Sequence, residues 1–211
     1  MRRNFLHPPS SVLEYLADAV RVLGVASVLV LAIWGTGTDA GILAFTLPAL
    51  LLPRFLGARA GFDIMFGVSV LIAAWSNVLD VYTTVPWWDL VVHFVCTGVI
   101  VVAAYLTLAQ VKVVADPRRA GSSARTPLVL ASALGLAVSA LWEMVEWFGY
   151  TFITDDIFVA YADTIGDMAV GGLGGVCAGI VLAFVRLRRP DADDHGSAAP
   201  TDSVQSAGRP R

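Results

Sequence analysis

The sequence predicts an all-α polytopic membrane protein, a bundle of about six transmembrane helices, and three observations lead to this prediction. Of the 211 residues, 57% are hydrophobic and only 15% are charged, and the mean hydropathy is +0.72. Most of the chain divides into apolar runs of membrane-spanning length, since roughly 20 helical residues cross roughly 30 Å of hydrocarbon. Lys and Arg collect in every second connection between the runs, which is the pattern of cytoplasmic loops.

Five apolar runs are long enough to span a bilayer, and a sixth is shorter. The five predicted spans are 16–34, 62–82, 87–110, 126–148 and 163–185. The sixth run, 41–56, contains Pro48 and Pro53, so it is open to two interpretations, a kinked span and a re-entrant hairpin. We expect a transmembrane domain over 16–185, a cytoplasmic N-terminal segment over 1–15 and a disordered cytoplasmic tail over 186–211.

The positions of Lys and Arg favour the six-span interpretation. The connections 35–40, 83–86 and 149–162 contain no Lys or Arg. With six spans, every cationic segment lies on the opposite side, and both termini lie in the cytoplasm. The residues concerned are Arg2, Arg3, Arg54, Arg59, Lys112, Arg118, Arg119, Arg125, Arg186, Arg188 and Arg189. We therefore expect a multi-pass protein of the plasma or inner membrane.

Ionisable side chains recur near the predicted outer ends of the last three spans. Such residues inside spans are costly and mark functional sites by default. Residues three or four apart share one face of a helix, so each of these spans presents a pair. The pairs are Asp89 with His93, Glu143 with Glu146, and Asp163 with Asp167.

Two further features accompany these pairs. Gly171, Gly175 and Gly179 continue the four-residue rhythm of the last span, a small-residue ridge that favours close packing of membrane helices. Asn77 and Asp80, at the outer end of the third predicted span, form an accessory pair at the same depth.

The outer half of the predicted bundle has no Lys or Arg to compensate these carboxylates. Buried carboxylates without counter-ions bind a metal, retain protons or line a water-filled cavity. Carboxylates and a histidine on facing helices are typical of metal sites in helical bundles. Oxygen ligands favour Mg, Mn or Fe, and the imidazole is also compatible with Zn. The predicted ligands are Asp89, His93, Glu143, Glu146, Asp163 and Asp167, and Glu143 or Glu146 is predicted to act as a general base.

Several of these residues also have simpler interpretations. His93 alone is typical of a hydrogen-bonded packing residue. Asp155 and Asp156 read as solvated loop residues. Cys96 and Cys177 read as small packing residues without a disulfide.

Three segments carry a resemblance to a known family. WWDLVVHF (Trp87 to Phe94), ALWEMVEW (Ala140 to Trp147) and DTIGDM (Asp163 to Met168) resemble, in order and in spacing, the YjdF-like family of uncharacterised bacterial inner-membrane proteins. This resemblance implies a multi-span membrane protein without an assigned reaction. A more distant likeness is to VanZ-like proteins, from which the chain departs at Glu146 and in lacking an Asn after Asp167.

Three hypotheses for function follow. The first is a metal-dependent hydrolase or transferase that acts on a lipid or envelope precursor at the outer face. The second is a proton- or cation-coupled transporter, which requires polar continuity to the cytoplasmic side. The third is a membrane scaffold in which the polar cluster only orders the helices. All three have the lipid bilayer as a partner, and none involves nucleic acid.

Overall fold

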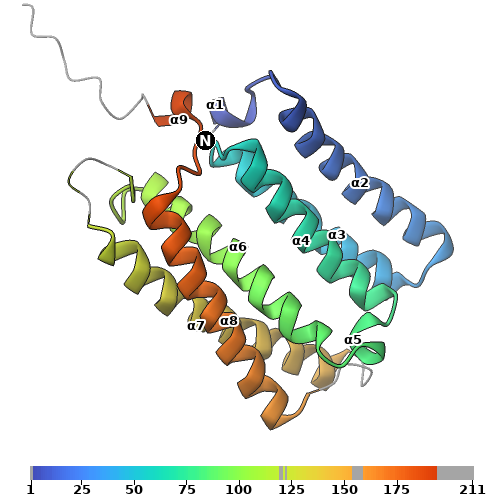
Figure 1. The fold of residues 1–211 in the computed structure, drawn as a ribbon. Coiled ribbons are helices and arrows are strands. Elements are labelled where there is room, and N and C mark those ends of the chain that lie inside the picture. The colour runs from blue at the N-terminus through green and yellow to red at the C-terminus, as the bar shows by residue number, and fades with distance from the viewer. Residues whose placement is uncertain (1, 119–120, 122, 154–158, 194–211) are drawn as a thin grey trace, which may run out of the picture.

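The computed structural model describes residues 2–118, 121, 123–153 and 159–193, and within them the chain is almost entirely helical. Six long helices lie side by side (Figure 1). They are α2 (Val12–Trp34), α3 (Gly37–Phe55), α4 (Ala60–Val78), α6 (Trp88–Gln110), α7 (Arg125–Phe152) and α8 (Tyr161–Phe184). Three helices of four residues each accompany them: α1 (Arg2–Phe5), α5 (Val81–Thr84) and α9 (Pro190–Asp193).

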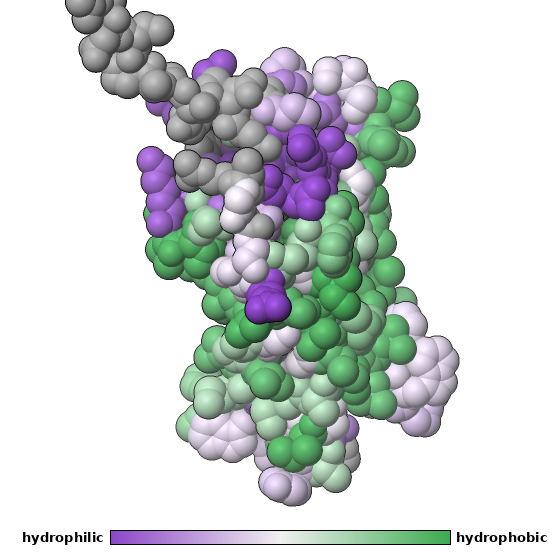
Figure 2. Space-filling view, turned by 60° about the vertical axis from the view of Figure 1, so that its left-hand side comes forward, coloured by the Kyte–Doolittle hydropathy of each residue, from purple (hydrophilic) through white to green (hydrophobic). Residues whose placement is uncertain are grey.

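Five of the long helices, α2, α4, α6, α7 and α8, are long and apolar enough to cross a membrane. Figure 2 shows hydrophobic side chains over the middle of the visible face, with hydrophilic residues gathered at the end where both described ends of the chain lie. The all-α prediction is confirmed.

The weakest predicted run, 41–56, belongs to one continuous helix. α3 begins at a capping box, in which the Thr36 hydroxyl accepts from the Asp39 backbone and the Asp39 carboxylate accepts from the Thr36 backbone, both at 3.1 Å. The helix then continues through Pro48 and Pro53 without reversing. Membrane helices tolerate prolines where neighbouring groups compensate for the lost backbone bonds. α2 and α4 pack against α3, in which Pro53 is buried and Pro48 is exposed. The chain therefore does not form a hairpin here.

The third predicted span, 62–82, is longer than the helix that forms. α4 ends at Val78, because Asp80 adopts a left-handed conformation with φ of 53° that an α-helix cannot contain. The chain then forms the short helix α5 before it enters α6. Elsewhere the helices extend beyond the predicted spans, with α2 starting at Val12 and α7 ending at Phe152.

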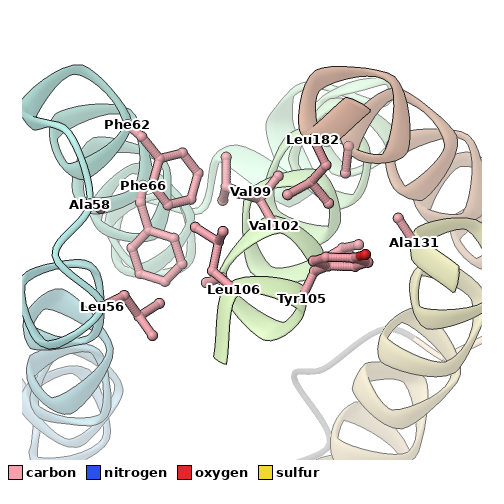
Figure 3. Packing of buried hydrophobic residues seen from close by; sticks show 13 residues of the cluster. Leu56, Ala58, Phe62, Phe66, Val99, Val102, Tyr105, Leu106, Ala131 and Leu182 are labelled. Atoms are coloured by element: carbon pink, nitrogen blue, oxygen red, sulfur yellow. The ribbon is translucent and has the colours of Figure 1, made fainter. Parts of the chain in front are cut away.

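The long helices form two groups of three that meet between α4 and α6. α2, α3 and α4 contact one another, and so do α6, α7 and α8. Figure 3 shows the junction, where Phe62 and Phe66 of α4 lie beside Leu106 of α6. The same buried cluster continues to Leu182 of α8. The interior at this level is apolar across both groups.

α8 approaches its two neighbours backbone to backbone. A Cβ atom added at Gly175 would lie 2.7 Å from Gly135 Cα and 2.8 Å from the carbonyl oxygen of Ala131, both on α7. On the other side, a Cβ atom at Gly174 would collide with the Phe94 carbonyl of α6. The small-residue ridge predicted from the sequence therefore packs against α7 through Gly175 and Gly179, whereas the backbone contact with α6 is made by Gly174, which the prediction did not include.

Ion pairs bind the N-terminal group of helices together at the cationic end. Arg21 of α2 donates to both carboxylate oxygens of Asp63 on α4 at 2.6 Å, and to Asp18 at 2.9 Å. Arg54 of α3 also pairs with Asp18. All three helices of this group are thus joined by charged side chains.

The first residues of the predicted disordered tail are ordered. The Arg59 backbone N–H donates to the Leu187 carbonyl at 2.7 Å, and the Arg189 N–H donates to the Gly57 carbonyl at 2.9 Å. Gly57 has φ of 67°, a conformation that favours glycine. The prediction of disorder from residue 186 was wrong for this part, because the loop between α3 and α4 offers it backbone partners; residues 194–211 lie outside the described residues.

Substituting Gly175 by Ala should destabilise the protein by about 2 kcal/mol, because the added methyl group meets backbone atoms that cannot move aside independently. In detergent this corresponds to a fall of about 4–8 °C in the unfolding midpoint. Gly166→Ala on the same helix is the matched control, since its Cβ would have only Leu90 Cδ2, at 3.8 Å, as a neighbour. Equal midpoints for the two variants would contradict the close approach of α7 and α8.

Candidate metal centre

The candidate site lies at the end of the bundle opposite the ion pairs, where three helix ends meet. Asp89 and His93 occupy the first turns of α6, and Asp167 lies in the second turn of α8. Glu143 and Glu146 lie in the last turns of α7, which runs in the opposite direction. The glycine contacts of α8 hold these three helix ends close enough for their acidic side chains to meet.

His93 is the centre of the arrangement. It is only 5% exposed, and its two ring nitrogens face carboxylates from different helices. Nε2 lies 3.5 Å from Asp89 Oδ1, and Nδ1 lies 3.8 Å from Glu143 Oε1. Both distances exceed those of ordinary hydrogen bonds. They are close to the separation of about 3.4 Å between two nitrogen and oxygen ligands of a tetrahedral zinc ion.

Two groups of ligand atoms can be formed around this ring. Asp89, His93 and Asp167 form one, and His93, Glu143 and Glu146 form the other. In each group one ligand atom from every residue lies within 4.8 Å of the others. His93 belongs to both groups, so five of the six predicted ligands are brought together.

Two buried carboxylate oxygens of the site accept no hydrogen bond from any described residue. They are Glu143 Oε1 and Asp167 Oδ1. Asp167 is 1% exposed and Glu143 is 9% exposed. Leaving a buried polar atom without a partner costs about 1–3 kcal/mol, and more for a charged group. These two oxygens therefore lack a hydrogen-bond donor among the described residues.

The remaining predicted site residues lie at the margin or outside. Asp163 is half-buried and acts electrostatically on Asp89 and Asp167, but it belongs to neither group of ligand atoms found among the described residues. Asn77 and Asp80 are exposed, because the left-handed turn at Asp80 ends α4 before it reaches the site. Asp155 and Asp156 lie outside the described residues.

Two side chains outside the predicted ligand set support the site. The Trp142 indole N–H donates to Glu146 Oε1 at 2.8 Å, four residues along α7. The Ser139 hydroxyl, fully buried, donates to the Asp167 carbonyl at 3.1 Å and joins α7 to α8. Trp142 and Glu146 are four residues apart and so share one face of the helix, a spacing from which their contact could have been predicted.

Tyr82 of α5 lies near Asp89 and Glu146 and is bonded to α4. Its hydroxyl donates to the Ala73 carbonyl at 3.0 Å. Burial raises the pKa of the Tyr82 phenol, and the negative charges of Asp89 and Glu146 act in the same direction. The phenol therefore stays protonated and remains a hydrogen-bond donor.

In protein stripped of metal by a chelator, Asp167→Asn should raise the free energy of unfolding by about 1 kcal/mol, or the midpoint by about 2–4 °C. The substitution removes one of several like charges that repel one another in a buried position. Asp163→Asn, on the same helix but outside both ligand groups, should change the midpoint less. A lower midpoint for Asp167→Asn would show that its charge is already compensated by the protein.

Comparisons with known proteins identify a family but supply no activity. No curated protein and no solved structure matches the chain. A family model described as "predicted membrane protein" (DUF2238) matches residues 17–188, which include all six long helices apart from the start of α2. The chain therefore belongs to this family of predicted membrane proteins and is a multi-pass helical membrane protein.

Proposed function

We propose that this protein is a metal-dependent membrane enzyme, a hydrolase or transferase acting on a lipid or envelope precursor at the outer face of the membrane. The observation that carries the proposal is the pair of buried, unpartnered oxygens of Glu143 and Asp167 beside the ring of His93. A divalent cation would satisfy both oxygens and compensate their charge.

The distribution of charge supports a cation that comes from solution. The connections 35–40, 83–86 and 149–162 contain no Lys or Arg, and their described residues lie at the same end of the bundle as the site. At the other end, the acids of α2 and α4 are paired with Arg21 and Arg54. The protein thus neutralises the carboxylates of one end with its own arginines and leaves those of the other end for a ligand.

The ligand types restrict the ion. One imidazole and several carboxylates suit Zn, Mn or Fe, and Mg where water completes the shell. A bound ion of this kind polarises a carbonyl or phosphoryl group and generates a nucleophile from water at neutral pH. Glu146 is half-buried at the edge of the site and is held by the Trp142 N–H, which supports a role in accepting the proton of that water.

The surroundings of the site favour a membrane-associated substrate over transport. On the α7 turns that carry Glu143 and Glu146, Trp142, Met144 and Trp147 are exposed and available to acyl chains. Between the site and the end of the bundle that carries the ion pairs, the interior is filled by the apolar cluster around Val101, Leu106 and Leu182. A transported ion would have to cross that cluster.

The proposal includes a topology of six spans with both termini in the cytoplasm. α3 has 19 residues, about 28 Å of helix at 1.5 Å per residue, and it lies between α2 and α4. That length matches a hydrocarbon core of roughly 30 Å. With α3 crossing, the metal centre faces the extracytoplasmic side.

Single cysteines introduced into a variant lacking Cys96 and Cys177 test this topology. Thr84→Cys should react with a membrane-impermeant maleimide in intact cells or spheroplasts, whereas Ser10→Cys and Ser123→Cys should react only after permeabilisation. All three positions are exposed. Labelling of Ser10→Cys from outside would show that α3 does not cross.

Metal content tests the proposed function. Protein purified in detergent and dialysed without chelator should contain at least one equivalent of a transition metal by elemental mass spectrometry. His93→Ala should lose it, since His93 belongs to both ligand groups. Asp163→Asn is the matched control and should retain it. Folded, metal-free wild-type protein would count against the enzyme and favour proton-linked transport. Metal-loaded protein should then convert a component of a membrane-lipid extract, and His93→Ala should not.

A further inference from the structure

The imidazole of His93 is placed between two carboxylates rather than beside one. Asp89, four residues earlier on α6, lies on the Nε2 side at 3.5 Å, and Glu143 of α7 lies on the Nδ1 side at 3.8 Å. A histidine that ligates a single metal ordinarily donates its other N–H to a carboxylate, which fixes the ring. Such a bond joins nitrogen and oxygen at about 2.7–3.2 Å, and neither contact here is that short.

Each side of the ring also has its own buried oxygen without a partner. Asp167 Oδ1, in the group with Asp89, accepts no hydrogen bond from the described residues. The same holds for Glu143 Oε1, in the group with Glu146. Both side chains are more than nine-tenths buried. A single ion on one side would leave the oxygen on the other side unsatisfied.

The charge of the site also favours two bound ions over one. The two groups together contain four carboxylates, Asp89, Glu143, Glu146 and Asp167, and the sequence has no Lys or Arg in the connections 35–40, 83–86 and 149–162. One divalent cation would leave two of the four carboxylate charges uncompensated at the end of a bundle embedded in lipid. Two divalent cations compensate all four carboxylates, and the only negative charge that remains is that of a shared His93 ring that has released its proton.

We propose that the centre holds two divalent cations, one on each side of the His93 ring. Asp89 and Asp167 bind the ion on the Nε2 side, and Glu143 and Glu146 bind the ion on the Nδ1 side. Glu146 binds through one carboxylate oxygen, which leaves the oxygen held by the Trp142 N–H to accept a proton. This inference rests on the proposed function, because it specifies the occupancy of the same site. Neutral imidazole carries one ring proton, so binding of the second ion to the ring releases that proton to solvent.

Titration of chelator-treated, detergent-purified protein with Mn²⁺ tests the proposal, with bound metal measured after equilibrium dialysis. Wild type and the control Asp163→Asn should bind two equivalents. Asp167→Asn and Glu143→Gln should each bind one, because each loses one side of the ring. His93→Ala should lose high-affinity binding. Circular dichroism and size-exclusion chromatography establish that each variant is folded.

Electron paramagnetic resonance of the same samples provides a second readout. Two Mn²⁺ ions that share the ring should give an exchange-coupled spectrum in wild type, and this should be replaced by the six-line spectrum of an isolated ion in both one-ion variants. Wild type that binds one equivalent would overturn the two-ion proposal and leave the metal-dependent function intact. Two equivalents with uncoupled spectra would overturn the sharing of His93. Absence of binding in folded wild type would overturn both proposals.

Discussion

The close approach of α8 to α6 and α7 is the constraint on which the candidate site depends. Side chains as short as aspartate can meet from three helices only where the backbones nearly touch, and here Gly174 faces the Phe94 carbonyl while Gly175 faces Gly135. Inside a bilayer no hydrophobic effect drives helices together, so this contact depends on packing between small residues and on polar bonds. The Ser139 hydroxyl, donating to the Asp167 carbonyl, supplies one such bond one turn from the site.

The sequence predicted those parts of the structure that follow from helical periodicity. The spacing of Asp89 and His93 and the glycine rhythm of the last span are properties of a single helix, so they can be read without knowing its neighbours. Placing these pairs at one depth also required only the alternation of loop charges. Helical spacing and loop charges therefore predict the four carboxylate residues that surround His93, together with His93 itself.

Other features depend on contacts between distant segments or on a single backbone angle. α4 ends where it does because Asp80 adopts a left-handed conformation. Aspartate adopts this conformation only in some structural contexts, so the apolar run that reaches Tyr82 does not predict the end of the helix. The same turn leaves Asp80 exposed and brings the Tyr82 phenol beside the site. The ordered start of the C-terminal segment depends on backbone partners in the loop between α3 and α4, more than 100 residues earlier in the chain.

This last contact has a consequence for biogenesis. The backbone partners of Gly57 and Arg59 are at positions 187 and 189, which are translated after all six long helices. The N-terminal three helices can associate early through Arg21 and Asp63, whereas the pairing that ties their loop to the far end of the chain is among the last to form. A nascent chain halted before α8 would therefore lack Asp167, the glycine ridge and this pairing at once. Completion of the site and closure of the bundle thus belong to the same final step of membrane insertion.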